Sequence, residues 1–263
     1  LPGHADLTAN EKYHGFQDFR GGGPFSGRIT AGITAAGAVA FQALAAKGIH
    51  IGTHILSCAG IYDRGFDSLH KDIEYLSDAD FAVLDESVIP SMKDAILAAK
   101  QDGDSVGGRL ETAVIGMPAG VGEPWFDTLE GVLAHALFSI PAVKGVEFGA
   151  GFASADMRGS ECNDLLFGDG NTVTAGSNNS GGILGGISNG MPLLFRTAVK
   201  PTPSIYRPQQ TVDMRTMEST TLTINGRHDP AIVHRARIVV DSITALVLCD
   251  QLALRFGTDW IKE

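Results

Sequence analysis

The chain has 263 residues, of which 44% are hydrophobic and 19% charged, so it can form one large globular domain or two fused lobes. Its formal net charge of −10 argues against nucleic acid or an anionic membrane as the main partner, because both repel negative surfaces. An anionic small molecule stays possible, since a local group of arginines can outweigh the average field.

The predicted elements follow a polar, glycine-rich opening at 1–28. Residues 30–47 are apolar and uncharged until Lys47, which predicts a buried helix with Thr30 as a cap and Gly48 as its stop. The later elements, in order, are a strand at 49–62, a helix at 90–101, a strand at 109–117, a helix at 126–139, a strand at 142–148, a loop at 150–182, one or two strands within 183–199, and a long helix at 231–256.

Three cysteines, Cys58, Cys162 and Cys249, lie far apart and lack CxxC spacing. They indicate reduced thiols in a cytosolic protein. We predict no membrane span, because no apolar run is long enough to cross a bilayer. The chain opens at Leu1 in a polar segment without an initiator Met, so we expect an N-terminal piece to be missing.

Two pairs of segments resemble each other. Residues 107–118 match 181–192 without gaps, and 27–31 match 226–230, each member of the second pair preceding an apolar helix. The pattern indicates a duplicated strand–helix unit in two related lobes. Chance similarity between glycine-rich turns is the alternative.

Two common phosphate-binding motifs are absent from the sequence. There is neither a GxxxxGK[ST] segment nor a GxGxxG that opens a helix after a strand. Several glycine- or proline-rich turns instead carry a cation, at Arg20, Arg28, Lys200 and Arg227. Because backbone N–H groups and arginine forks both bind anions, these turns predict a ligand with several negative charges.

Histidines occur in two different contexts. His4 and His228 lie beside charged residues in loops, where an imidazole can be tuned for proton transfer, although a histidine without a special role is the alternative. His50 and His54 share one face of a predicted strand. With no third ligand evident, we interpret them as the polar face of that strand and predict no metal site.

Residues 186–190 match the GxSxG pattern of a hydrolase nucleophile elbow. That motif requires a strand, a sharp turn and a helix, whereas a strand-like segment follows here. We therefore interpret Ser188 as a turn or ligand-contact residue and keep a serine hydrolase as an alternative.

Many segments together resemble the signatures of chorismate synthases, in order and over essentially the whole chain. They lie at 2–6, 20–31, 105–108, 122–127, 139–149, 181–190, 200–205 and 226–230. The family's N-terminal Gly-Glu-Ser-His-Gly segment, with a second active-site histidine and substrate-binding arginines, is not in this chain. Pro24 also stands where the family often has a basic residue. A catalytically inactive fragment is therefore a further alternative.

The resemblance implies a lyase of the shikimate pathway of aromatic amino acid biosynthesis. It converts 5-enolpyruvylshikimate 3-phosphate to chorismate and phosphate by a 1,4-elimination that needs reduced FMN, supplied through NADPH or a flavin reductase. The implied fold is α+β, a β-α-β sandwich with helices packed between antiparallel sheets and an internal duplication. The implied assembly is a cytoplasmic homotetramer, and residues 1–263 form one N-terminally incomplete domain. A doubly wound parallel sheet is the alternative fold.

The resemblance also implies roles for individual residues. His4 is the acid near the departing phosphate and a substrate contact, Asp229 works with flavin N5 to remove the carbon-bound proton, and Arg227 contacts flavin and substrate and holds Asp229 ionised. Arg28 meets the substrate or supports the flavin loop. The implied flavin contacts are Pro24, Phe25, Ser26, Pro141, Ala142, Gly185, Lys200, Pro201, Thr202, Pro203, Ser204 and Arg227.

Overall fold

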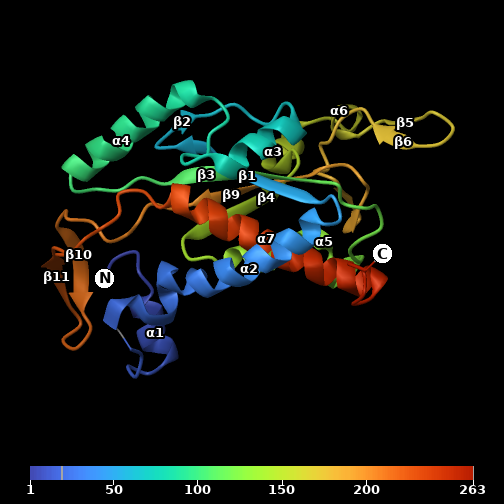
Figure 1. Ribbon diagram of the computed structural model, residues 1–263. Coiled ribbons are helices and arrows are strands. Elements are labelled where there is room, and N and C mark those ends of the chain that lie inside the picture. The colour runs from blue at the N-terminus through green and yellow to red at the C-terminus, as the bar shows by residue number, and fades with distance from the viewer. Residues whose placement is uncertain (19, 263) are drawn as a thin grey trace.

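The computed structural model describes residues 1–18 and 20–262 and contains a five-stranded antiparallel sheet (Figure 1). Its strand order is β2-β1-β3-β9-β4. The strands are β1 (His50–Cys58), β2 (Ile61–Tyr62), β3 (Gly108–Ile115), β4 (Val143–Phe148) and β9 (Leu193–Val199). Every pairing in the sheet is antiparallel, so the alternative of a doubly wound parallel sheet is wrong.

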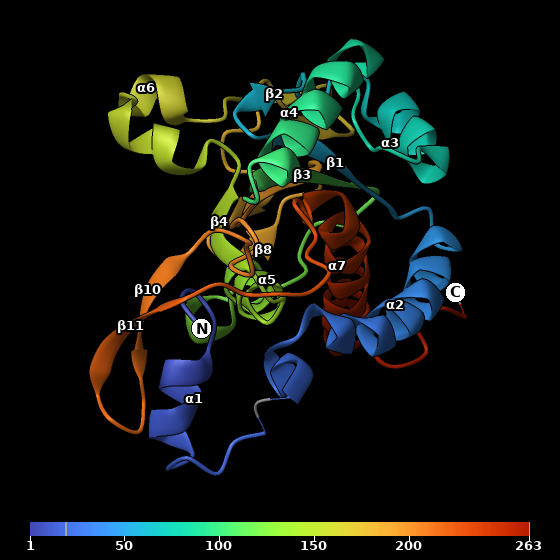
Figure 2. The same ribbon diagram turned by 90° about the vertical axis from the view of Figure 1, so that its left-hand side faces the viewer.

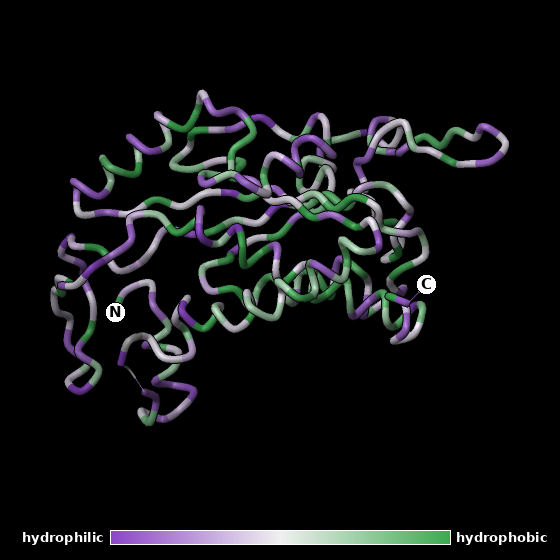
Figure 3. The backbone as a smooth tube through the Cα atoms, in the orientation of Figure 1, coloured by the Kyte–Doolittle hydropathy of each residue, from purple (hydrophilic) through white to green (hydrophobic). Residues whose placement is uncertain are grey.

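Three helices pack on one face of this sheet. They are α2 (Thr30–Ala45), α5 (Leu129–Phe138) and α7 (Val233–Phe256). In Figure 1 they lie below the strands, and Figure 3 shows that this interior is mostly hydrophobic. The alternation along β9 explains the layer, because Leu193, Phe195, Thr197 and Val199 are buried whereas the residues between them are half-buried. Burial of these apolar faces supplies the main stabilising term.

The start of α2 differs slightly from the sequence prediction. Thr30 is the first helical residue, not the cap. Its Oγ1 donates a hydrogen bond to Gly27 O at 2.7 Å, whereas the side chain of a cap would accept one from a backbone N–H. The helix ends at Ala45, and Gly48 follows at φ +72°. The stretch Gly27–Ala45 also meets the length and composition of a membrane span, contrary to our expectation. However, Gly37 lies against Ser242 of α7 so closely that a Cβ would come within 2.3 Å of it, which is the contact of a packed helix.

The other elements cover the opposite face and the ends of the sheet (Figures 1 and 2). The helices are α1 (Asp6–Lys12), α3 (Leu69–Asp78), α4 (Ile89–Gln101) and α6 (Gly159–Cys162). Three two-stranded ribbons are β5 (Leu166–Gly168) with β6 (Val173–Ala175), β7 (Ile183–Leu184) with β8 (Ile187–Ser188), and β10 (Gln209–Asp213) with β11 (Glu218–Leu222). The predicted loop at 150–182 therefore contains a short helix and a hairpin.

The α+β class is confirmed, with helices packed against an antiparallel sheet. The turns at Gly27 and Gly226 precede α2 and α7, and these two helices pack together. The other pair of similar segments differs in structure, since 108–115 is one strand whereas 183–188 is a short hairpin. The internal duplication and the single domain over 1–263 stay predictions.

Candidate functional site

The turn that begins at Lys200 is attached to the first residues of the chain. His4 Nε2 lies 2.8 Å from Ser204 Oγ in a partly buried hydrogen bond. Lys200 Nζ donates to Gly3 O at 2.7 Å. Gly3 has φ +71°, and a Cβ there would come within 2.7 Å of Pro203, so this approach requires glycine. The structure thus brings His4 to the turn that the sequence associates with the flavin.

The loop between α4 and β3 joins this turn to the one that ends at Pro230. Ser105 Oγ donates to Thr202 O at 2.6 Å. The next residue, Val106, donates its backbone N–H to Pro230 O at 2.8 Å. Two turns that are distant in sequence therefore converge on one loop, at the same end of the molecule as the N-terminus (Figures 1 and 2).

The second turn carries Asp229, the predicted proton acceptor. Its Oδ2 lies 2.9 Å from Arg235 Nη1, in the first turn of α7, and its side chain is 27% exposed. We expected Arg227 to be the neighbouring cation, but Arg227 is exposed and Arg235 makes the ion pair. Arg235 is therefore a residue that the sequence did not indicate, since nothing in the Gly-Arg-His-Asp-Pro motif points to it.

The environment of His4 favours its neutral form. Burial is the main cause that lowers the pKa of His4; Asp6 opposes this shift, and the charges of Lys200 and His228 add to it. The imidazole is therefore near cations that would attract an anionic ligand. A bound anion would reverse the shift, because a negative charge close by favours the imidazolium.

The Pro141–Ala142 segment also lies beside the Lys200 turn, because Lys200 N donates to Ala142 O at 2.9 Å. Ala142 has φ +76°, a left-handed conformation that costs a residue with a Cβ about 1–2 kcal/mol. Such local strain is common where the backbone contacts a ligand.

Gly185 is not brought to this cluster within one chain. It lies in the β7–β8 turn, next to Gly186, whose carbonyl accepts from Leu129 N at the start of α5. Pro141 follows the other end of the same helix. The ten residues of α5 span about 15 Å at 1.5 Å per residue, so the two predicted contacts are a helix length apart.

Residues Pro24, Phe25, Ser26 and Arg28 form tight 3₁₀ turns before α2. Ser26 Oγ accepts from Arg28 N at 3.2 Å, and Phe25 is 47% exposed. Figures 1 and 2 place these turns at the same end of the molecule as the beginning of α7.

Ser188 does not form a nucleophile elbow. It is buried in β8, its Oγ donates to Pro118 O at 2.6 Å, and it accepts from Val121 N at 2.9 Å. Strand β9 follows, not a helix. Both hydrogen-bonding roles of the hydroxyl are filled by the backbone, so the serine hydrolase alternative is wrong.

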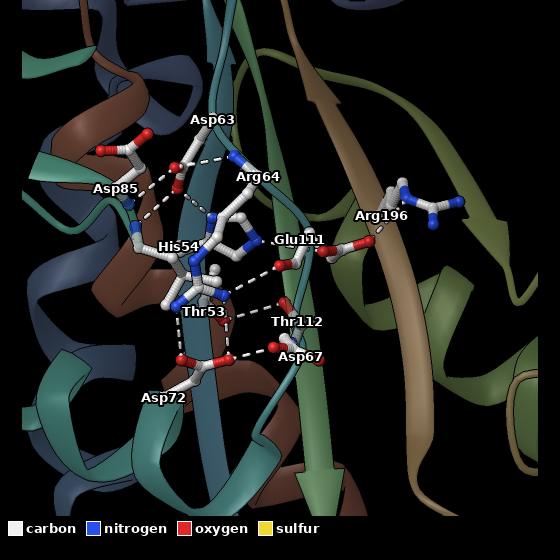
Figure 4. Close-up of polar contacts among 12 residues, drawn as sticks. Thr53, His54, Asp63, Arg64, Asp67, Asp72, Asp85, Glu111, Thr112 and Arg196 are labelled. Carbon is white, nitrogen blue, oxygen red and sulfur yellow. Dashed lines mark hydrogen bonds and ion pairs between the residues drawn. The ribbon is translucent and has the colours of Figure 1, made fainter. Parts of the chain in front are cut away.

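A second polar cluster crosses the sheet, and Figure 4 shows its centre. His54 is fully buried, with Nδ1 2.8 Å from Asp63 Oδ2 and Nε2 3.0 Å from Glu111 Oε2. Glu111 Oε1 accepts from Arg196 Nε at 2.9 Å, and Arg196 lies 3.5 Å from Glu147. His54, Glu111, Arg196 and Glu147 are register partners on β1, β3, β9 and β4. We call these four and Asp63 the charge row.

The charge row is a structural feature, not a site for a ligand. Burial alone would lower the pKa of His54, but the hydrogen bonds to Asp63 and Glu111 outweigh it, so this pKa is raised. Both ring nitrogens of His54 are bonded to carboxylates, so they are not available to a metal. His50, its predicted partner on the strand, is exposed.

A cavity of about 720 Å³ lies apart from the predicted residues, between α2, α3 and α7. Asp241 and Arg237 line it, 3.6 Å apart. Burial raises the pKa of Asp241 to about 6, while Arg237 opposes the shift. None of the predicted site residues lines this cavity, so the candidate site rests on the two converging turns.

The fold is that of an α+β protein in which two turns that carry cations converge on one loop. The sequence profile of the chorismate synthase family matches residues 1–253. The chorismate synthase of Dehalococcoides mccartyi is 51% identical over 97% of this chain and 70% of its own length, and that of Pyrococcus abyssi is 47% identical over 97% and 70%. A crystal structure of a chorismate synthase superposes with a TM-score of 0.80 at 30% identity, covering 97% of this chain and 72% of the other.

The chain therefore belongs to the chorismate synthase family. Its activity is that of a chorismate-forming lyase of the shikimate pathway.

Proposed function

We propose that the protein converts 5-enolpyruvylshikimate 3-phosphate to chorismate and inorganic phosphate by a 1,4-elimination that requires reduced FMN. One C–H bond and one C–O bond break, the C=C bond between them is replaced by a conjugated diene, and no net redox change occurs. The observation that carries the proposal is the convergence of His4, Lys200 and Asp229 at two turns joined by one loop. Membership of the family supports the same reaction.

The Lys200 turn has features that suit the binding of FMN. Thr202 Oγ1 is buried without a hydrogen-bond partner among the residues that the structure describes, so it can serve a ligand at little cost. Lys200 supplies a cation, and the strained Ala142 lies one hydrogen bond away. We assign the flavin to residues 200–204 with Pro141, Ala142 and the turn at 24–26. When bound, reduced FMN supplies an electron-rich group that assists loss of the phosphate.

Asp229 is the residue that takes up the carbon-bound proton in this proposal. The guanidinium of Arg235 lies against one carboxylate oxygen, and the partial exposure of Asp229 leaves it open to a ligand. Arg227, exposed two residues earlier in the same turn, is free to meet anionic groups of flavin and substrate.

His4 protonates the departing phosphate in this proposal. Ser204 holds one ring nitrogen, which fixes the orientation of the imidazole. The neutral imidazole of the free protein gains its proton when the polyanionic substrate arrives, since that charge offsets Lys200 and His228. Arg28 lies in the 3₁₀ turn just before α2, and we assign it to contact with the substrate.

Within one chain, Gly185 lies about one helix length from the flavin contacts at Pro141 and Ala142. We therefore assign Gly185 to a flavin site that is completed by a second copy of the chain. This agrees with the homotetramer that the family resemblance implies. NADPH or a flavin reductase would keep the flavin reduced in the cytoplasm.

The test is an anaerobic assay of the full-length protein with chemically reduced FMN and the phosphorylated substrate. We expect inorganic phosphate and chorismate to form in equal amounts, and only when the flavin is reduced. Binding of oxidised FMN, followed by its fluorescence, is a separate readout. Phosphate release without flavin would contradict the proposal. Turnover by the full-length protein but not by residues 1–263, with FMN binding retained by both, would favour the inactive-fragment alternative.

A further inference from the structure

Tyr206 connects the two turns of the candidate site through its side chain. Its ring centroid lies 4.8 Å from that of His228, with an angle of 56° between the planes. Its hydroxyl donates to the backbone carbonyl of Gly226. Both contacts fall on the residues immediately before Asp229, so Tyr206 braces the turn that presents the predicted proton acceptor.

Tyr206 is itself held by the loop that joins the two turns. Its backbone N–H donates to Gly103 O at 2.9 Å. Gly103 has φ +67°, and a Cβ there would lie 3.1 Å from Tyr206 Cβ, so the two backbones fit closely. The next residue, Arg207, donates to Asp102 O at 3.0 Å and pairs with Asp104 at 3.2 Å. The tyrosine ring therefore projects from a well-anchored backbone.

The end of the braced turn is held by the Asp229–Arg235 ion pair and by the hydrogen bond from Val106 N to Pro230 O, whereas the structure describes fewer contacts for Gly226, Arg227 and His228. His228 Nε2 lies 3.3 Å from Ile224 O, a contact within the turn. Gly226 has φ +155° and no side chain, so its backbone has wide conformational freedom. Arg227 is exposed. Packing of His228 against a fixed ring is thus the contact best placed to select one conformation of the first half of this turn, Gly226 to His228.

We propose that Tyr206 is a positioning residue for the chorismate-forming reaction: it holds the Gly226–Asp229 turn so that Asp229 faces the Lys200–Ser204 turn. The inference rests on the proposed role of Asp229. It assigns no chemical step to Tyr206, and it separates two contributions, ring packing on His228 and the hydroxyl bond to Gly226.

Two substitutions separate these contributions. Tyr206→Ala removes both contacts, and because a misplacement of about 1 Å can cost up to about 100-fold in rate, we expect kcat to fall about 10- to 100-fold. Tyr206→Phe keeps the ring and loses one exposed hydrogen bond, so we expect a loss of less than about 10-fold. In both variants the Kd for FMN should change by a smaller factor than kcat, because Arg227 is the one proposed flavin contact on the braced turn, whereas the Lys200 turn is held by Gly3, Ala142 and Ser105.

Tyr75 provides a matched control. It is 40% exposed against 44% for Tyr206, and its hydroxyl also donates a hydrogen bond, to Glu86 at 2.7 Å, but it lies on α3. Tyr75→Ala and Tyr75→Phe should leave kcat unchanged. The unfolding midpoint of every variant is measured so that a global loss of structure is recognised.

An NMR readout tests the positioning directly and does not depend on the flavin. The ring current of Tyr206 shifts the Hε1 signal of His228, so Tyr206→Ala should move that signal toward its free-histidine value, whereas Tyr206→Phe should retain it. An unmoved signal in Tyr206→Ala overturns the inference.

The outcomes distinguish a failure of the proposed reaction from a failure of the positioning role of Tyr206. If the unmodified protein shows no flavin-dependent phosphate release, the proposed function is wrong and the inference falls with it. If that release occurs but Tyr206→Ala matches the unmodified kcat, the inference alone is wrong. A fall in kcat in Tyr206→Ala that Tyr206→Phe largely avoids, and that exceeds any change in the Kd for FMN, supports it.

Discussion

The molecule contains two groups of histidine, carboxylate and arginine that are built in opposite ways. The charge row lies across four neighbouring strands, and its histidine is fully buried between two carboxylates. The candidate site gathers His4, Asp229 and Arg235 from the chain start, a glycine turn and the start of a helix, with Asp229 partly exposed. Strand register fixes the first group, whereas loop contacts assemble the second.

The two histidines show what this difference does to the same side chain. Hydrogen bonds that His54 makes to two carboxylates outweigh burial and raise its pKa, whereas burial and nearby cations lower the pKa of His4. In the charge row, the closed group, the charged side chains are paired with one another. In the candidate site, the open group, cations and a partly buried imidazole lie where a polyanionic ligand can pair with them. Each prediction below tests one side of this contrast.

The largest expected effect is on activity at the open site. Asp229→Asn keeps the size of the side chain but removes the proton acceptor, so we expect turnover to fall by about 10²- to 10⁴-fold while FMN still binds. The measurement is phosphate release with reduced FMN. Asp213→Asn is the control, because Asp213 pairs with Arg215 at 3.3 Å on the surface. Normal turnover in Asp229→Asn would refute the assignment.

The second-largest expected effect is a loss of unfolding free energy when the charge row is broken. Glu111→Gln leaves His54 and Arg196 without their shared carboxylate, and breaking a buried ion pair costs about 3–5 kcal/mol of unfolding free energy. Denaturant unfolding measures this loss. Glu147→Gln is the matched control, since that carboxylate is partly exposed and 3.5 Å from Arg196, and an exposed pair contributes about 0–1 kcal/mol. Equal effects of the two substitutions would contradict a closed charge row.

The pH dependence of stability tests the same row. The raised pKa of His54 adds stability that is complete below 6.5, its ordinary value, and is lost as pH rises through the folded-state value. The lowered pKa values of Asp63 and Glu111, held down mainly by the hydrogen bond from His54 against the opposing effect of burial, add stability that is lost as pH falls below about 4.

Unfolding free energy should therefore decrease as pH rises above 6.5, by at most about 1.4 kcal/mol per pH unit for one proton. His54→Gln should abolish that decrease. His4→Asn should not, because the pKa of His4 is shifted the other way. A slope that persists in His54→Gln would assign the titration to another group.

The contrast also explains what the sequence could and could not predict. The strand at 109–117 and the helix at 90–101 follow from local patterning, and both are present within two residues of the expected bounds. The glycine- and proline-rich turns of the candidate site were predicted from the sequence because they carry cations. The contacts of Arg235 and Tyr206 were not, because they depend on how distant turns meet in space. Likewise, the alternation in β1 placed His54 on a polar face but could not reveal that Glu111 lies opposite it.

The smallest expected effect is a proton taken up at the open site. Burial and, to a smaller extent, nearby cations lower the pKa of His4, and a phosphate-bearing ligand offsets the cations, so substrate binding at pH 7 should take up a fraction of one proton. Titration calorimetry in two buffers of different ionisation enthalpy measures this number. His4→Asn should remove the uptake, and His54→Gln should leave it intact, because the buried imidazole does not meet the ligand. Uptake that is unchanged in His4→Asn would show that another group, with His228 the nearest candidate, accepts the proton.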